Sequence, residues 1–226
     1  MEVIYEDNHL IAINKQISDL VQGDRSGDES LDLQVKAYIK KKYKKPGDVF
    51  LGVVHRLDRP VSGVVLFART SKALTRMNEL FRDHKVSKTY WAVVKERPEN
   101  PEGTLVHHLL RNEIQNKSYA HASPKRGSKE ARLSYRLIGS TNNHYLLEVM
   151  LETGRHHQIR VQLSRIGCPI RGDLKYGFPR SNPDGGIHLH ARSISFRHPV
   201  SGVDLTLHAK PPSDPLWNEF LQQAGQ

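Results

Sequence analysis

One acidic side chain, Asp58, stands among basic residues, and such an arrangement can do chemistry. Its neighbours are His55, Arg56 and Arg59. Nearby cations favour the ionised form of a carboxyl group and lower its pKa, and an ionised Asp can act as a nucleophile or as a general base. The same residues also fit a structural ion pair or a turn cap, because many perturbed carboxyl groups serve only structure. The residue types alone leave both interpretations open.

Two short apolar runs flank this polar segment, and both predict buried strands. Residues 50–54 and 64–68 are rich in β-branched and aromatic side chains, which buried strands favour. The segment between them carries Pro60 and a Ser-Gly pair at 62–63, and these are turn residues. We therefore expect Asp58 on a loop that two rigid strands hold in place.

The residues around this Asp resemble a known catalytic motif. The segment 55–58 (His-Arg-Leu-Asp), followed by Ser-Gly and an apolar strand, is similar to the active-site motif of the RluA-type pseudouridine synthases. In that family the Asp is the catalytic residue, so the resemblance implies this role for Asp58. It also implies that a uridine within RNA, flipped out of its stack, is isomerised from an N1- to a C5-glycosidic linkage without a cofactor. Attack at C1′, attack at C6 and removal of a sugar proton all remain open.

A second stretch, residues 153–160, reads Thr-Gly-Arg-His-His-Gln-Ile-Arg. Thr153 is a good N-cap, and apolar residues at helical spacing predict a helix that continues to Gly167. The stretch resembles the family pattern Thr-Gly-Arg-x-His-Gln-Ile/Leu-Arg, whose last Arg pairs with the catalytic Asp, and this implies the same role for Arg160. A guanidinium can hold a carboxylate in bidentate fashion and stays charged. We expect Arg155 to contact substrate, although surface or phosphate contacts would suit both arginines.

Shorter pieces extend the resemblance to other parts of the chain. Tyr90 lies in a Lys-x-Tyr-x-Ala pattern, whose Tyr stacks on the target base in the family and could assist proton removal at C5. Leu189 lies in a Leu-His-Ala piece, whose aliphatic residue packs under the base, although its type alone predicts a core residue. The likeness further implies substrate contacts for His55 and for Arg56, which would fill the gap that the flipped base leaves.

The resemblance is incomplete at three positions. Asn14 and Lys15 match the start of the family's Asn-Lys-Pro-x-Gly segment and are expected to contact substrate. Gln16 and Ser18 stand where the family has Pro and Gly, and Val61 stands where it usually has Thr. These departures leave room for a second function class, a catalytically idle RNA-binding or ribosome-assembly factor on the same fold. The intact catalytic set argues against that class.

The rest of the chain predicts short strands with a few helices. Apolar residues at helical spacing predict helices over 30–42 and 71–84 and a final helix after Asp214-Pro215. Strand-like stretches follow one another between residues 88 and 151, which implies an antiparallel sheet rather than βαβ units. The family likeness implies an α+β fold, with a mixed, mostly antiparallel central sheet flanked by helices. We expect a single catalytic domain over residues 1–226, without an S4 domain.

The helix expected over 30–42 ends in a basic cluster. A polar loop over 18–29 precedes this helix, and Pro46-Gly47 closes it. Cations suit a helix C-terminus because the helix dipole is negative there, so a solvated helix end is one interpretation. Contact with RNA phosphates is the other. The lysines of the cluster are Lys36, Lys40, Lys41, Lys42, Lys44 and Lys45.

The composition favours a polyanionic partner. The 226 residues carry 34 Lys and Arg against 24 Asp and Glu, a net charge of +10, which suits RNA, DNA or an anionic membrane surface. No apolar run approaches the ~20 residues that span a bilayer, and the N-terminus lacks a signal-peptide layout. We expect a cytoplasmic monomer that acts on a stem-loop of ribosomal RNA or tRNA. Cys168 is the single cysteine and the 13 histidines show no zinc-ligand spacing, so we expect no metal. The sequence has neither a Gly-x-Gly-x-x-Gly nor a Walker A loop, so we expect no nucleotide cofactor.

Overall fold

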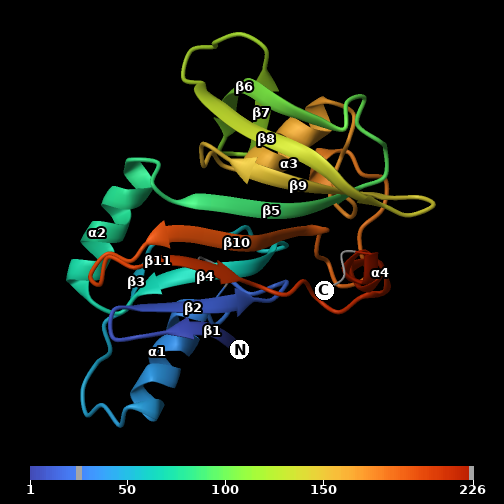
Figure 1. The fold of residues 1–226 in the computed structure, drawn as a ribbon. Coiled ribbons are helices and arrows are strands. Elements are labelled where there is room, and N and C mark those ends of the chain that lie inside the picture. The colour runs from blue at the N-terminus through green and yellow to red at the C-terminus, as the bar shows by residue number, and fades with distance from the viewer. Residues whose placement is uncertain (24–26, 224–226) are drawn as a thin grey trace. The chain divides into compact units, whose positions relative to one another are not determined.

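The computed structural model of the protein describes residues 1–23 and 27–223 (Figure 1). The predicted loop over 18–29 therefore has its middle, residues 24–26, outside the described residues. Within the described part of the chain, no helix is both long enough and apolar enough to cross a membrane.

The contacts of the chain divide it into two compact units, each formed by two segments. We call them unit 1 and unit 2. Unit 1 holds Met1–Val86 and Ala191–Lys210, and unit 2 holds Ser87–His190 and Pro211–Gln226. The predicted Asp58 loop belongs to unit 1, whereas Tyr90, Arg160 and Leu189 belong to unit 2.

Unit 1 is built on strands in the order β1-β2-β4-β10, with β3 paired to β4 and β11 paired to β10. The pairs β1–β2, β2–β4, β3–β4 and β10–β11 are antiparallel, while the arrows of β4 and β10 point the same way (Figure 1). The bounds are β1 Glu2–Glu6, β2 Leu10–Lys15, β3 Gly52–Val53, β4 Ser62–Ala68, β10 Leu189–Arg197 and β11 Asp204–His208. The first two residues of β10 belong to unit 2.

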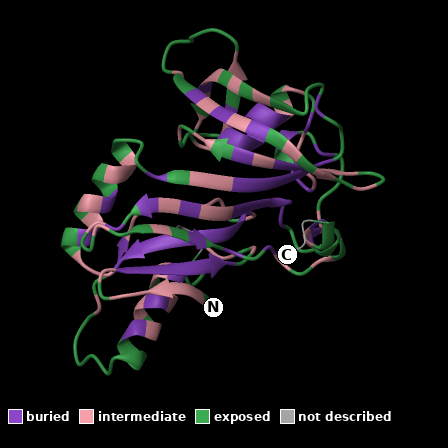
Figure 2. Cartoon of the chain, in the orientation of Figure 1, coloured by how far each residue is buried: buried purple, intermediate pink, exposed green. Residues whose placement is uncertain are grey.

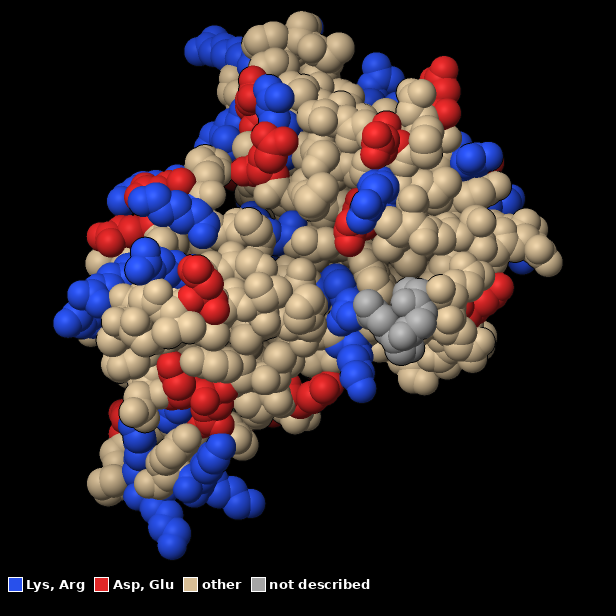
Figure 3. Space-filling view, viewed as in Figure 1, with Lys and Arg blue, Asp and Glu red and all other residues tan. Residues whose placement is uncertain are grey.

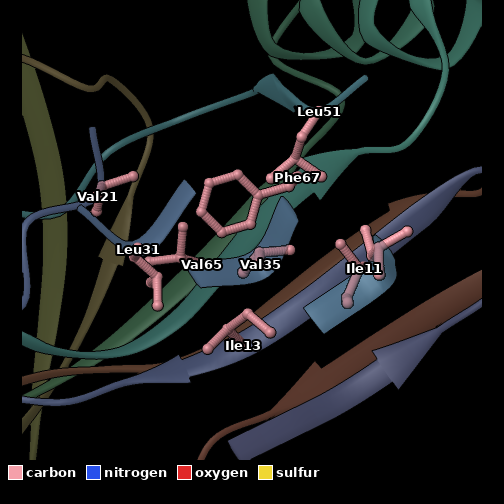
Figure 4. Packing of buried hydrophobic residues seen from close by; sticks show 9 residues of the cluster. Ile11, Ile13, Val21, Leu31, Val35, Leu51, Val65 and Phe67 are labelled. Atoms are coloured by element: carbon pink, nitrogen blue, oxygen red, sulfur yellow. The ribbon is translucent and has the colours of Figure 1, made fainter. Parts of the chain in front are cut away.

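The two central strands of unit 1 are buried along their whole length. Every residue of β2 and β4 is buried, as Figure 2 shows, because each lies between two other strands. Helix α1 (Leu31–Lys42) covers one face with Leu31, Val35 and Ile39, which pack with apolar side chains of β2 and β4 (Figure 4). This apolar layer keeps β4, the strand that follows the Asp58 loop, rigid.

Helix α2 (Ser71–Arg82) also belongs to unit 1. Its N-cap is Thr70, whose hydroxyl accepts a hydrogen bond from the Ala73 N–H at 3.2 Å. The predicted helix over 71–84 is thus confirmed to within two residues. Gly63 at the start of β4 has a φ of +118°, and a Cβ there would collide with the backbone of Ala191. The Ser-Gly pair after the Asp58 loop therefore lets β10 approach β4 closely.

Unit 2 is an antiparallel sheet in the order β5-β9-β8-β6-β7. At its end, the Asp214 carboxylate accepts hydrogen bonds from the Leu216 and Trp217 N–H groups, both at 2.9 Å, and so caps α4. Trp217 and Phe220 of α4 pack with Trp91 of the sheet. The bounds are β5 Ser87–Val94, β6 Glu102–Asn112, β7 Lys117–His121, β8 Lys129–Ser140, β9 Tyr145–Leu151, α3 Gln158–Arg165, the 3-10 turn η1 Leu174–Tyr176 and α4 Pro215–Gln223.

The predicted fold class is confirmed, and two predicted elements are wrong in part. Of the buried strand expected over residues 50–54, only Gly52–Val53 form a strand, and Phe50 is 47% exposed. The strands are mixed and mostly antiparallel, and four α-helices accompany them within the described residues. The helix expected to begin after Thr153 begins at Gln158 instead, and its N-cap is His157 in a left-handed conformation. Arg155 accordingly lies in a turn before the helix.

Candidate active site

The Asp58 loop joins β3 to β4 in unit 1 and is fixed at both ends. Its second half closes in a turn, where the Val61 N–H donates to the Asp58 carbonyl at 3.0 Å. Near its start, the His55 Nε2 accepts a hydrogen bond from the Leu66 N–H of β4 at 3.0 Å, and the imidazole stacks on Phe81 of α2. The half-buried Asp58 side chain is thus carried by a short, tethered segment.

Lys15 is the main internal support of this loop. Its side chain is fully buried, with 0% exposed, and its ammonium donates to three carbonyl oxygens, of Gln16 at 3.0 Å, Arg59 at 3.1 Å and Val61 at 2.6 Å. Burial lowers the pKa of Lys15 to about 8, against the opposing effect of the Asp19 and Asp58 carboxylates. A charged group so deep in a protein persists only when its donors are satisfied, and here two of the acceptors, Arg59 and Val61, follow Asp58 in the loop.

The segment after Lys15 forms a tight turn although two of its residues depart from the family pattern. Gln16 replaces Pro, and its N–H donates to the Asp19 carboxylate at 3.1 Å, a bond that a proline could not make. Ser18 replaces Gly and has a φ of +74°, the left-handed region that glycine favours. The Ser18 N–H donates to the Arg59 carbonyl at 3.1 Å. The turn therefore binds the same Arg59 carbonyl as the Lys15 ammonium and adds a second contact to the Asp58 loop, although Ser18 is strained.

Replacing Ser18 by Gly should stabilise the protein, because glycine removes the strain of a left-handed non-glycine residue. We expect the free energy of unfolding to rise by about 0.5–1 kcal/mol, measured by urea titration. Ser140→Gly in β8, where the backbone φ is negative, is the matched control and should lower the stability by a similar amount. Loss of stability in Ser18→Gly would show that the serine side chain supports the turn.

Asn14 contributes to the fold of unit 1. It is 4% exposed, and its amide nitrogen donates to the Glu2 carboxylate at 2.9 Å and to the Lys210 carbonyl at 3.0 Å. These bonds tie β2 to β1 and to the segment after β11. Arg56, by contrast, is exposed and can reach a ligand. Contacts of Asn14, Lys15 and Arg56 with substrate remain predictions.

Arg160 in unit 2 has a partner that the sequence did not identify. Its Nε donates to Asp173 Oδ2 at 2.7 Å and its Nη2 donates to Oδ1 at 2.9 Å, the bidentate geometry of a strong ion pair. The two side chains are 6% and 1% exposed. The guanidinium also lies over the Tyr176 ring, 5.1 Å from its centroid. Asp173 therefore fixes the orientation of the guanidinium for which the family motif predicts a role beside the catalytic Asp.

A buried polar network surrounds Tyr176. Its hydroxyl accepts the Ser118 N–H at 2.9 Å and lies 2.8 Å from His157 Nδ1. The His157 ring stacks on the His156 ring, with centroids 3.7 Å apart, and His156 Nδ1 lies 2.9 Å from the Ser118 hydroxyl. His156 thus joins β7 to the start of α3.

The Gln158 side chain closes the turn that precedes α3. Its Oε1 accepts hydrogen bonds from the Thr153 hydroxyl at 2.8 Å and from the Arg155 N–H at 2.9 Å, while its Nε2 donates to the Arg132 carbonyl at 3.0 Å. Thr153 is engaged by this turn and by the Arg132 N–H at 2.9 Å, which explains why it does not cap a helix. The Arg155 side chain donates to the Glu130 carbonyl at 2.9 Å.

Tyr90 and Leu189 are both nearly buried within unit 2. Tyr90 is 8% exposed on β5, opposite Val149 of β9, and Leu189 is 4% exposed at the start of β10. Their contacts with a target base remain predictions. Among the described residues, no three His, Cys, Asp or Glu side chains are arranged to hold a metal ion.

Comparison with known proteins assigns the chain to a family. The family described as RNA pseudouridylate synthase matches residues 9–165. "tRNA pseudouridine synthase C" of Pectobacterium carotovorum subsp. carotovorum is 32% identical, over 100% of this chain and 62% of that protein. "Ribosomal large subunit pseudouridine synthase C" of Rickettsia prowazekii (strain Madrid E) is 34% identical, over 93% of this chain and 68% of that protein. The chain belongs to the RNA pseudouridylate synthase family, as its motifs predicted.

A solved structure supports the same assignment. "Human RNA Pseudouridylate Synthase Domain Containing 4" has a TM-score of 0.80 and 25% sequence identity, over 98% of this chain and 92% of that chain. The chain spans 62% and 68% of the length of the two bacterial relatives. The names of these two relatives differ in the RNA, which is tRNA for one and large-subunit ribosomal RNA for the other.

Proposed function

We propose that this protein is an RNA pseudouridine synthase that isomerises a specific uridine of ribosomal RNA or tRNA. Asp58 is the catalytic residue. Its carboxylate attacks C1′ of the ribose, attacks C6 of the uracil or removes a proton from the sugar. Arg160 pairs with this carboxylate, Tyr90 stacks on the flipped base and assists proton removal at C5, and Leu189 packs under the base.

One observation carries this proposal beyond family membership, namely the buried ammonium of Lys15. It holds the Asp58 loop through the Arg59 and Val61 carbonyls. A reaction that detaches, turns and rejoins a base needs its acting carboxylate within a fraction of an ångström of the productive position. An idle RNA-binding factor has no such requirement, so a costly buried cation under this loop favours catalysis. Asp173, which fixes Arg160 at two nitrogens, supports the role of the arginine in the same way.

The test is release of tritium to water from transcribed ribosomal RNA and tRNA labelled at uridine C5. The wild-type protein should release tritium, and Asp58→Asn should reduce the rate at least about 10³-fold because the acting carboxylate is lost. Asp48→Asn is the matched control, since Asp48 is exposed in the same unit, and it should keep the wild-type rate.

The other outcomes separate the alternatives. Intact RNA binding without tritium release from either RNA would support the idle RNA-binding factor. Equal release by wild type and Asp58→Asn would refute the role of Asp58. Mapping of the modified position in the active case would name the substrate.

A further inference from the structure

The C-terminal end of α1 carries a dense set of positive charges, visible at the lower end of Figure 3. Five of these charges are lysines that we call the α1 lysine cluster. Four of them are exposed, namely Lys40, Lys41, Lys44 and Lys45, and Lys36 is half-buried. Among the described residues, none of these five side chains forms an ion pair with an acidic residue.

A buried carboxylate holds this helix end to β1. The Glu6 side chain is 8% exposed and accepts hydrogen bonds from Lys42 at 2.6 Å, Tyr43 at 2.8 Å and Tyr38 at 3.0 Å. It also pairs with Arg69 at 3.1 Å. Burial raises the pKa of Glu6, but its hydrogen bonds from lysine and tyrosine outweigh burial and lower the pKa overall. The lysine cluster is therefore presented by a helix end that is fixed in place.

This arrangement of charges costs stability. Lys36 and Lys40 are four residues apart, the spacing at which like charges on a helix repel each other. The helix dipole offsets part of the repulsion only within the last turn. The acidic group that does reach this end, Glu6, neutralises Lys42 and leaves the cluster unpaired.

The backbone at the end of α1 adds a second cost. The Lys45 N–H donates to the Lys40 carbonyl at 3.1 Å and the Lys44 N–H donates to the Lys41 carbonyl at 3.4 Å, which is the hydrogen-bond pattern of a Schellman motif. In this motif the first residue past the cap is left-handed and is usually glycine. Lys44 occupies that position with a φ of +50°, so a lysine stands where glycine would be less strained.

The other helices of the chain provide the comparison. Helix α3 ends in the same motif with Gly167 at the left-handed position, at a φ of +79°. Helix α2 also ends in it, with His84 at a φ of +55°. The chain therefore uses glycine at one of these three positions and accepts strain at the other two, Lys44 and His84. At Lys44 the strained residue also adds an exposed positive charge.

From these observations we propose that the α1 lysine cluster is a docking surface for RNA phosphates, separate from the residues that handle the target uridine. The choice of RNA rests on the proposed function. This surface carries unpaired positive charges, and Glu6 holds it rigidly. The repulsion among its lysines and the strain at Lys44 both lower the stability of the protein. Phosphate contacts of this type set affinity and position on the RNA without reading its sequence.

The first experiment uses the strained lysine. Lys44→Gly and His84→Gly each relieve a left-handed residue in the same motif, so both should raise Tm by about 2 °C. At pH 8, binding of transcribed tRNA and ribosomal RNA should weaken several-fold in Lys44→Gly alone. The slope of log K against log salt concentration for Lys44→Gly should be smaller in magnitude by about one, as expected for one lost phosphate contact. Equal RNA binding by both variants would overturn the proposal.

The second experiment removes three exposed charges. The variant Lys40→Gln/Lys41→Gln/Lys44→Gln should bind RNA about tenfold more weakly at 100 mM salt, with a slope shallower by about two. The control variant Lys72→Gln/Lys85→Gln/Lys210→Gln loses the same net charge from exposed positions in unit 1 and should lose much less. Equal losses in both variants would overturn the proposal, since net charge alone would then explain binding.

Two further outcomes separate this surface from its alternatives. If the cluster variant loses binding to phosphatidylserine vesicles but keeps RNA affinity, the surface is a membrane contact and the proposal fails. If the wild type modifies no RNA while the cluster variant still loses RNA affinity, the docking surface stands and the proposed isomerase activity falls. In an active enzyme, the cluster variant should raise KM and leave kcat at saturating RNA unchanged.

Discussion

Replacing Lys15 by Met is expected to lower kcat about 10²-fold, because the loop that carries Asp58 loses its internal support. The Lys15 ammonium donates to three carbonyls, and a buried carbonyl without a donor costs about 1–3 kcal/mol. Relief from burying a charge offsets part of this cost. We therefore expect the free energy of unfolding to fall by about 2 kcal/mol, measured by urea titration alongside single-turnover kinetics.

RNA affinity separates this positioning role from a direct contact. Since the Lys15 side chain is 0% exposed, Lys15→Met should bind RNA with nearly wild-type affinity while kcat falls. Lys72→Met, at an exposed position, is the matched control and should change neither quantity. Loss of RNA affinity with kcat intact would instead support the substrate contact that the Asn-Lys motif implied.

The pH dependence provides a second signature of Lys15. Its pKa of about 8 lies below the ordinary value of 10.5, so the folded protein releases this proton before the unfolded chain does. The contribution of Lys15 to stability therefore increases between about pH 8 and 10.5. Activity should change in the opposite direction, because a neutral amine has two N–H donors for three carbonyls. We expect kcat to decline as pH rises through about 8, and this decline to be absent in Lys15→Met.

The sequence predicted most elements of this fold because their signals are local. The Thr70 cap and the Asp214 cap are short-range hydrogen bonds between neighbours in the chain, and residue type suffices to suggest them. The apolar runs on either side of Asp58 predicted strands for the same reason. The turn residues between these runs then placed Asp58 on a loop. The second run is β4, as predicted, but only Gly52–Val53 of the first run form a strand, β3.

The residues that hold the candidate site in place could not be predicted. Their contacts join segments that are distant in the sequence, and residue type alone does not indicate such contacts. A lysine in a strand normally predicts an exposed side chain, whereas Lys15 lies in the interior and binds carbonyls up to 46 residues away. Thr153 has the type of an N-cap, but the Gln158 side chain engages it in a turn. The Asp173 carboxylate meets Arg160 only because α3 and η1 fold together.

Replacing Asp173 by Asn should have the largest effect on the stability of unit 2. The change removes the Asp173 carboxylate from the buried Arg160 guanidinium, and breaking a buried ion pair from one side costs about 3–5 kcal/mol. We expect the free energy of unfolding to fall by about 3 kcal/mol, measured by urea titration. Asp83→Asn, in the exposed pair with Arg82, is the control and should cost less than about 1 kcal/mol.

The double variant Arg160→Met/Asp173→Leu separates structure from catalysis. Replacing both partners of a buried pair by apolar residues of similar size is often neutral, so this variant should regain most of the stability that Asp173→Asn loses. It should nevertheless remain inactive in the tritium assay, because Met lacks the guanidinium that the proposed function requires. Full activity in a stable double variant would contradict a catalytic role for Arg160 and make the pair with Asp173 its whole function. Inactivity with restored stability would leave the guanidinium itself as the group that the reaction requires.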